Sequence, residues 1–314
     1  MISFGPVPSR RLGMSLGINN IVTPKTCSYS CVYCQVGKTR AKSISRKSFY
    51  APEFIFEKIS QHLSHLDKSN FPDYLTFVSN GEPTLDINLG KSIALLKSIG
   101  IPVAVITNAS MLFDESVRDD LSLADWVSLK MDASDSKTWE KVNKPSPELY
   151  FEKHIKSIYL FAAKYNRILN TETMIVRGLN DNTENFSALA EMITRINPYK
   201  AYLSIPTRPP AEETVETPDV ESVNLAWQIL NSKNIKTELL TGFEGTNTGY
   251  TGNIYEDILN ITAVHPLRED SLAELLQKDN SDQHVIDSLI KQKLVRKVLY
   301  KGNMFFVREY HLNI

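Results

Sequence analysis

Short runs of hydrophobic and β-branched residues recur about every thirty residues along the first three quarters of the chain. Such runs, bounded by polar residues, are typical of β-strands. A first strand is expected within Ser15–Val22. Six further strands are expected at Tyr74–Val78, Val103–Ile106, Trp126–Met131, Thr173–Val176, Ala201–Ile205 and Ile235–Leu240.

Helical spacing separates these runs. Behind Pro52, which suits a first helical turn, hydrophobic residues follow at intervals of three and four, namely Ile55, Ile59, Leu63 and Leu66. Alternating strands and helices predict an α/β fold with a parallel sheet. The pattern fits an open or closed barrel as well as a doubly wound sheet.

The pattern changes after residue 241, where four glycines punctuate a polar stretch: Gly242, Gly245, Gly249 and Gly252. Residues 242–263 are predicted to be a linker behind a barrel domain of residues 1–241. Two short helices are then expected to begin near Ser271 and Ser281. The runs Val295–Tyr300 and Met304–Val307 predict a hairpin. Helix, helix and hairpin predict a winged helix-turn-helix over residues 264–314.

The composition fits this division. The chain has 314 residues, of which 42% are hydrophobic and 23% charged, enough for one large α/β domain and a small second module. No run approaches the roughly 18 consecutive apolar residues of a membrane span, and the first residues lack the pattern of a secretory signal. We therefore expect a soluble, cytoplasmic protein without a membrane partner.

The chain has three cysteines, Cys27, Cys31 and Cys34, in the spacing C-x3-C-x2-C. In a reducing compartment, clustered thiols more often bind metal than form disulfides. Three thiolates on one loop can bind three irons of a cubane cluster and leave the fourth iron open to a small chelating molecule. The alternative is a structural zinc site, which normally needs four ligands. There is no fourth cysteine, and His62 lies well downstream on a predicted helix.

With Tyr33 before the last cysteine, this motif resembles that of the radical S-adenosylmethionine (SAM) superfamily, C-x3-C-x-aromatic-C. After the second strand, the segment Ser79-Asn80-Gly81-Glu82-Pro83 is similar to the family's glycine-Glu-Pro segment, which binds the amino group of SAM. Asn80 replaces the first of the usual paired glycines, whereas Gly81, Glu82 and Pro83 remain in register.

Polar residues follow the next strands as well. Thr107 and Asn108 end the third strand, where family members place groups near the ribose of SAM. Lys130 and Asp132 end the fourth strand and Arg177 the fifth, again at positions familiar from relatives. For Lys130 or Arg177, an ordinary surface or salt-bridge role fits equally well. The carboxyl ends of barrel strands are where reactive groups collect.

The resemblance implies a partial (β/α)6 TIM-like barrel in which Cys27, Cys31 and Cys34, on a loop of residues 23–40, hold a [4Fe-4S] cluster. It also implies that an electron from a donor such as flavodoxin or ferredoxin cleaves SAM to a 5′-deoxyadenosyl radical, which abstracts a hydrogen from a substrate. Such an enzyme is oxygen-sensitive. The segments at residues 5–13 and 206–210 resemble iron–sulfur oxidoreductases related to the wyosine-forming tRNA enzymes.

The substrate is left open between RNA and a peptide or protein. Residues 1–52 hold eight Lys and Arg and no Asp or Glu, which favours contacts with RNA phosphates. A winged helix also serves peptide-modifying radical enzymes as a leader-binding module. A different class is a metal- or redox-sensing winged-helix regulator. Residues 262–314 carry eight basic and seven acidic residues, a weak basic footprint for DNA binding.

Overall fold

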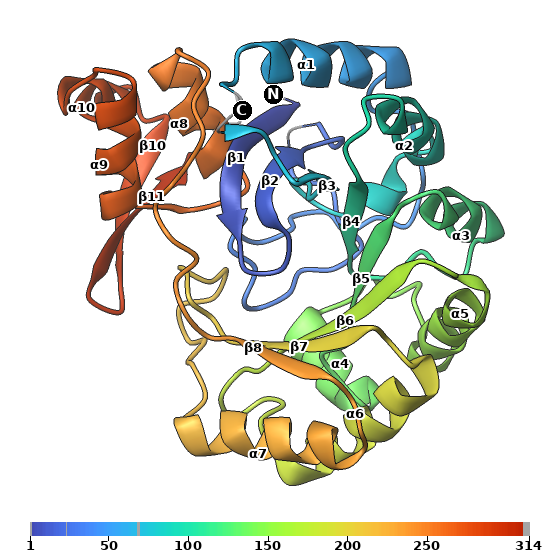
Figure 1. Ribbon diagram of the computed structural model, residues 1–314. Coiled ribbons are helices and arrows are strands. Elements are labelled where there is room, and N and C mark those ends of the chain that lie inside the picture. Colours follow the sequence, from blue (N-terminus) through green and yellow to red (C-terminus); the bar gives the residue numbers. More distant parts are fainter. Residues whose placement is uncertain (1, 23, 68–69, 310–314) are drawn as a thin grey trace.

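A computed structural model describes residues 2–22, 24–67 and 70–309. Its centre is a curved sheet in which eight strands lie in sequence order (Figure 1). The strands are β1 (Ser3–Ser9), β2 (Gly13–Ile18), β3 (Tyr74–Phe77), β4 (Val103–Thr107), β5 (Trp126–Lys130), β6 (Ile168–Met174), β7 (Lys200–Ser204) and β8 (Thr237–Leu240). The pairs from β2 to β8 are parallel, and β1 is antiparallel to β2. The expected barrel is confirmed, with seven parallel strands in place of six.

Helices cover the outer face of the sheet (Figure 1). They are α1 (Pro52–Ser64), α2 (Leu89–Lys97), α3 (Glu115–Ser122), α4 (Ser136–Asn143), α5 (Phe151–Lys164), α6 (Thr183–Ile196) and α7 (Val220–Ser232). The predicted stripe on α1 is buried at Ile55, Ile59 and Leu63, and Pro52 occupies its first turn. These side chains join Leu75 and Phe77 of β3 in the main core between helices and sheet.

The strand expected within Ser15–Val22 is β2, which begins earlier, at Gly13, and the ends of several other strands shift by one or two residues. Two strands differ more from the expectation. The chain pattern missed β1 because it contains Gly5, Pro6 and Pro8, and an edge strand tolerates proline where a central one does not. The fifth predicted strand, Thr173–Val176, is in reality β6 at Ile168–Met174. Asn170 and Glu172 are buried polar residues on the inner face of this strand and Thr171 is buried on its outer face, so hydrophobicity does not mark this strand.

The barrel is plugged at the amino-terminal end of its parallel strands. The turn between β1 and β2 carries Leu12, which packs with Trp126, Tyr202 and Leu240 in a small core of its own. β1 and β8 are the two free edges of the sheet, so the barrel is open between them. The polar interior of the barrel lies above this plug.

The C-terminal unit contains α8 (Ile254–Thr262), β9 (Leu267–Arg268), α9 (Glu269–Lys278), α10 (His284–Lys291), β10 (Val295–Tyr300) and β11 (Asn303–Arg308). The three strands form a sheet in the order β10-β11-β9. The two expected helices and the hairpin are present, while their identification as a winged helix-turn-helix stays a prediction.

Three details of this unit correct the sequence analysis. Residues 254–262, expected within a linker, form α8, whose Ile254, Ile258 and Ile261 are buried in the C-terminal core. That core also contains Phe4 and Val7 of β1, so the two predicted domains share apolar contacts. Ser271 lies inside α9, and α10 begins three residues after Ser281.

Candidate functional site

The cysteine loop lies over the carboxyl end of β3. Thr26 and Gly81 form a β-bridge, and the Glu82 amide donates to the Thr26 carbonyl at 3.1 Å. Gly81 has φ +142°, and a Cβ atom there would lie 1.8 Å from the Thr26 oxygen. Glycine at this position therefore allows the close approach of the loop to the Gly81-Glu82-Pro83 segment. Of the predicted loop 23–40, Thr23 lies outside the described residues.

Each cysteine sulfur has a nitrogen donor beside it. Asn108 Nδ2 lies 3.6 Å from the Cys27 sulfur, Asn143 Nδ2 lies 3.5 Å from that of Cys31, and Lys25 Nζ lies 3.1 Å from that of Cys34. Such donors stabilise thiolates and tune a metal centre by hydrogen bonding to the atoms that bind the metal.

Burial acts against these donors. It raises the pKa of Cys27 and of Cys31 to about 12. A metal must therefore displace protons from buried thiols. The chain supplies three cysteine sulfurs, each beside a nitrogen donor, and no fourth cysteine. This set fits a cluster in which the protein binds three of the four irons.

Glu82 is buried and holds the ends of two strands together. Its Oε1 accepts hydrogen bonds from the Thr84 amide at 3.1 Å and from the hydroxyls of Thr84 and Thr107 at 2.6 Å each. Its Oε2 accepts from the Asn108 amide at 2.8 Å. Burial raises the pKa of Glu82, and these hydrogen bonds act in the opposite direction. The carboxylate of Glu82 thus fixes Thr107 and the backbone of Asn108. The side-chain amide of Asn108 in turn reaches the sulfur of Cys27. The contact of Glu82 with SAM stays a prediction.

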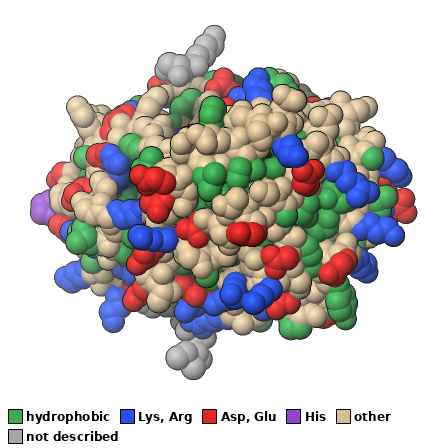
Figure 2. All heavy atoms as spheres, turned by 90° about the horizontal axis from the view of Figure 1, so that it is seen from below, with side chains coloured by type: hydrophobic (Ala, Val, Ile, Leu, Met, Phe, Trp, Pro, Cys, Tyr) green, Lys and Arg blue, Asp and Glu red, His purple; other side chains and the backbone are tan. Residues whose placement is uncertain are grey.

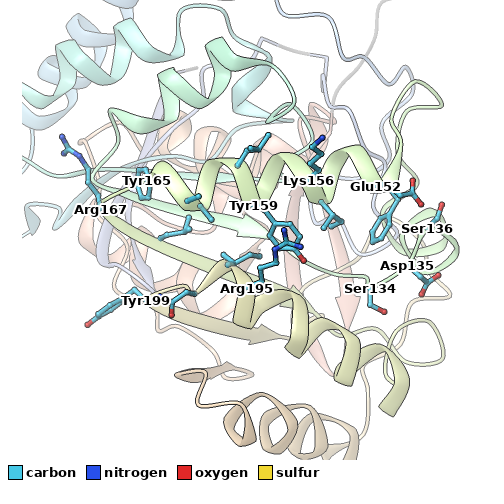
Figure 3. Close-up of a pocket in the computed structure, with 18 residues that line it drawn as sticks. Ser134, Asp135, Ser136, Glu152, Lys156, Tyr159, Tyr165, Arg167, Arg195 and Tyr199 are labelled. Carbon is cyan, nitrogen blue, oxygen red and sulfur yellow. The ribbon is translucent and has the colours of Figure 1, made fainter.

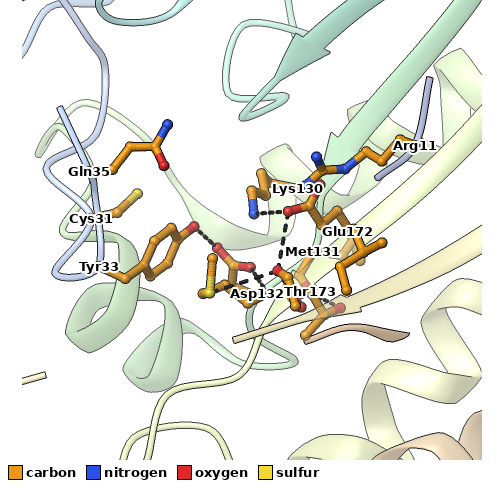
Figure 4. Close-up of polar contacts among 12 residues, drawn as sticks. Arg11, Cys31, Tyr33, Gln35, Lys130, Met131, Asp132, Glu172 and Thr173 are labelled. Carbon is orange, nitrogen blue, oxygen red and sulfur yellow. Dashed lines mark hydrogen bonds and ion pairs between the residues drawn. The ribbon is translucent and has the colours of Figure 1, made fainter. Parts of the chain in front are cut away.

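Asp132 links the cysteine loop to β5, β6 and α4. Its Oδ2 accepts hydrogen bonds from the Tyr33 hydroxyl and, at 2.7 Å, from Asn143 Nδ2, while Oδ1 accepts from the Met174 amide at 2.8 Å (Figure 4). Because Asn143 also reaches the Cys31 sulfur, Tyr33 and Asp132 position one side of the loop.

Lys130 points into the barrel and forms an ion pair with Glu172 at 2.9 Å, and Arg11 pairs with the other oxygen at 2.5 Å (Figure 4). Burial would raise the pKa of Glu172, but Arg11 and Lys130 outweigh it and hold it well below its usual range. For Lys130, burial is outweighed by Glu172 and Asp132, so its pKa is raised and the amine stays protonated. Lys130 is therefore a salt-bridge residue inside the barrel, and its contact with SAM stays a prediction.

Sequence reasoning missed Arg11, Glu172, Asn108's role at sulfur and Asn143. The polar run Asn170–Thr173 between apolar residues was the available signal for Glu172. Arg177 departs from the expected group in the other direction. Its side chain is 57% exposed and pairs with Glu216 at 3.7 Å, so the structure does not bring it to the other candidates. Gly81, Pro83, Thr107, Asn108, Lys130, Asp132 and Tyr33 lie where the sequence analysis expected, at the carboxyl ends of strands or on the loop over them.

An open cavity of about 1160 Å³ lies on the outer side of the sheet between α5 and α6 (Figure 3). Arg195 stacks over the ring of Tyr159 there, 4.1 Å from its centroid. None of the cysteines lines this cavity. Its position in the helical layer separates it from the barrel interior.

Residues 21–192 match the model of the radical SAM superfamily. The chain belongs to this superfamily. It is 43% identical over 310 residues to the UPF0026 protein MJ1312 of Methanocaldococcus jannaschii, covering 98% of this chain and 96% of that one. It is 26% identical over 219 residues to a probable dual-specificity RNA methyltransferase RlmN of Endomicrobium trichonymphae, covering 67% and 60% of the two chains.

Among solved structures, the radical SAM fold is shared with a structure of TYW1 with a lysine-pyruvate adduct bound. The TM-score is 0.56 at 17% identity, over 76% of this chain and 80% of that one. This likeness is one of fold, and it accords with the resemblance to wyosine-forming enzymes. Membership of the superfamily makes the chain an enzyme and implies a [4Fe-4S] cluster and SAM as its cofactors.

Two observations concern the described part of the chain only. No helix there is long and apolar enough to cross a membrane. No group of three or more His, Cys, Asp and Glu side chains there is drawn together as a site for a single metal ion.

Proposed function

We propose that this radical SAM enzyme binds its cluster through Cys27, Cys31 and Cys34, binds SAM at the carboxyl ends of β3 to β6, and abstracts a hydrogen from an RNA base. The observation that carries the site is the set of nitrogen donors, one beside each cysteine sulfur, supplied by Asn108, Asn143 and Lys25. When bound, the cluster and SAM supply the electron transfer and the 5′-deoxyadenosyl radical. An external one-electron donor such as flavodoxin or ferredoxin is part of this proposal, as are oxygen sensitivity and a reducing, cytoplasmic setting.

The protein's own residues then position the cysteine loop and exclude water from it. Asn108, held by Glu82, and Asn143, held by Asp132, each donate to one sulfur and thereby couple strand ends to the cysteine loop. Tyr33 is half-buried and donates to Asp132, so its ring covers that side of the cysteine loop. Lys130 and Arg11 both pair with Glu172, which fixes these two cations in the barrel interior beneath the proposed SAM site.

An RNA substrate is supported by similarity to an RNA methyltransferase and by exposed cations near the cysteine loop. Not all eight basic residues of segment 1–52 are available for it. Arg11 pairs with Glu172, Arg46 with Asp120, and Lys42 donates to the carbonyls of Lys144 and Pro145. Lys38, Arg40 and Lys47 are exposed, so we assign RNA contacts to these three.

The test is anaerobic reconstitution of the full chain followed by incubation with SAM, reductant and deuterated RNA. Deuterium in 5′-deoxyadenosine is expected with RNA. A parallel incubation with a deuterated peptide pool tests the second substrate class. Deuterium transfer from the peptide alone would replace RNA with a peptide substrate, and absence of 5′-deoxyadenosine in every incubation would refute the enzyme assignment of this site.

A further inference from the structure

A second group of charged residues lies at the open edge of the barrel and contacts the cysteine loop through Gln35. The Glu244 carboxylate forms a direct ion pair with Arg208. Its oxygens also lie 3.1 Å from His265 Nε2 and 3.8 Å from Arg10 Nε. Arg10 belongs to the turn between β1 and β2, and Arg208 follows β7. Residues from both sides of the opening therefore converge on one carboxylate.

The group is buried and carries more positive than negative charge. The side chain of Glu244 is 5% exposed and those of Arg10 and Arg208 are 15% exposed. Burial and the neighbouring arginines lower the pKa of Arg208 to about 9, and the same causes hold His265 neutral by lowering its pKa. Two guanidinium groups thus share one carboxylate, an arrangement that favours a further or more highly charged anion.

Glu244 lies on a connector between β8 and α8, residues 241–253, which has no helix or strand. Gly245 and Gly252 there adopt positive φ angles of 107° and 84°. The connector crosses to β1, where the Gly249 amide donates to the Pro6 carbonyl at 2.6 Å. Arg10 also donates to the carbonyls of Leu240 and Gly242, at 2.5 and 2.9 Å. A few polar contacts therefore hold the carboxylate of Glu244 in place.

A cavity of about 190 Å³ adjoins this group, and Arg208 and Glu244 form part of its wall. Lys301 and Arg268, which is paired with Asp270, line it as well, whereas Arg10 reaches Glu244 from outside the cavity wall. Its volume corresponds to about six water molecules, enough for a phosphate group with a few attached atoms. Planar guanidinium groups bind phosphate oxygens in pairs.

The network also reaches the cysteine loop. Arg208 Nη1 donates to Gln35 Oε1 at 2.9 Å, and Gln35 Nε2 donates to the Val264 carbonyl at 2.8 Å. Gln35 directly follows Cys34. A change at Arg208 is therefore one hydrogen bond away from the loop that carries the cysteines.

We propose that Arg10 and Arg208 form a phosphate-binding site at the open edge of the barrel, and that Glu244 occupies it until a phosphate group of the substrate displaces this carboxylate. The substrate class rests on the proposed function, and the site itself does not. Displacement frees the connector from the arginine pair while Arg208 stays bonded to Gln35.

The test measures inorganic phosphate binding by calorimetry, at constant ionic strength, to the anaerobically reconstituted full chain. Glu244→Gln removes the competing charge and is expected to tighten phosphate about tenfold, the equivalent of about 1.4 kcal/mol. Arg208→Gln in either background should abolish binding. Glu191→Gln, which breaks the exposed pair with Lys233, is the matched control and should leave affinity unchanged. Equal affinity of wild type and Glu244→Gln, or binding that survives Arg208→Gln, would overturn the proposal.

A measurement on the unmodified chain guards against variants that fold poorly. Added phosphate should raise amide hydrogen exchange in residues 241–253 and leave α5 unchanged, and no change in the connector counts against the site. A nucleoside monophosphate and an oligoribonucleotide without a terminal phosphate separate a free nucleotide from the RNA backbone as the source. If the binding of either ligand changes in the Glu244 and Arg208 variants, the site is supported. If the binding of both ligands is the same in wild type and variants, the proposal is overturned.

SAM cleavage without substrate is measured in the same samples. Loss of cleavage with phosphate binding intact refutes the proposed function alone. Normal cleavage without a phosphate effect refutes the site alone.

Discussion

At the scale of single residues, each cysteine sulfur has a nitrogen donor beside it, and two of the three donors come from outside the cysteine loop. Cys31, at 3.5 Å from Asn143 Nδ2, lies between the other two cysteines. Cys31→Ala should lower the iron and sulfide content from about four of each to near zero and abolish SAM cleavage, because a cubane needs its thiolates. Iron and sulfide assays and the visible absorption measure this. Ser43→Ala, outside the motif, is the control. A variant with zinc bound and full activity would exclude the cluster.

Glu82 gives a second prediction at this scale. Glu82→Gln keeps the shape but places an amide N–H₂ group against donors from Thr84, Thr107 or Asn108. Losing charged acceptors of buried hydrogen bonds should lower the free energy of unfolding by about 2 kcal/mol. SAM binding should weaken about tenfold, while iron content stays intact. Chemical denaturation and equilibrium dialysis measure these effects. Unchanged SAM affinity would reduce Glu82 to a structural residue of the strand ends.

At the scale of elements, α8 depends on a buried carboxylate. Asp257 Oδ1 and Oδ2 accept hydrogen bonds from the hydroxyl and amide of Thr251 at 2.9 and 2.7 Å, which ties the connector to the helix. Burial raises the pKa of Asp257 to about 6, whereas the hydrogen bonds from Thr251 lower it. The folded state therefore binds this proton more tightly than the unfolded state.

Because the folded state binds this proton more tightly, the free energy of unfolding should increase as the pH falls. Between pH 7 and pH 5, Asp257 should add about 1 kcal/mol to it. Asp257→Asn removes the titration, so the difference in unfolding free energy between wild type and variant should change by this amount over the same range. Urea unfolding at each pH measures it. Asp287→Asn on α10 is the control. A pH-independent difference would mean that Asp257 titrates near its ordinary value.

At the scale of the whole molecule, the surface charges decide whether RNA can bind. Figure 2 shows acidic and basic side chains interspersed over one face, with no region of a single sign dominating it. The triple variant Lys38→Gln, Arg40→Gln, Lys47→Gln should reduce the slope of log affinity against log salt by about two to three units, roughly 0.7 to 0.9 for each phosphate contact. Fluorescence anisotropy with labelled RNA gives the slope.

Replacement of three exposed lysines elsewhere, Lys91, Lys233 and Lys236, should leave the slope unchanged. If both triples lowered it equally, the binding would be non-specific. Deleting residues 264–314 is a poor test of the C-terminal unit, because its core includes Phe4 and Val7 of the barrel. Removing it would expose apolar side chains of β1.

The sequence by itself determined the local features of this protein. The cysteine spacing, the Gly81-Glu82-Pro83 segment and the helical stripe behind Pro52 are short-range patterns, and each specifies its chemistry or element within a few residues. β1 and β6 escaped this reading, because proline tolerance at an edge and polar residues inside a barrel depend on neighbours far along the chain.

Only the tertiary structure decided which charges are free and which are paired. Arg11 meets Glu172 across the barrel, Arg46 meets Asp120, and Arg10 and Arg208 share Glu244, with partners from 36 to 234 residues apart in the chain. A count of eight basic residues in one segment cannot reveal this, since ion pairing depends on distance and burial in space rather than on sequence position. Of the basic residues in segment 1–52, Lys38, Arg40 and Lys47 are exposed, whereas Arg10 is largely buried and shares Glu244 with Arg208.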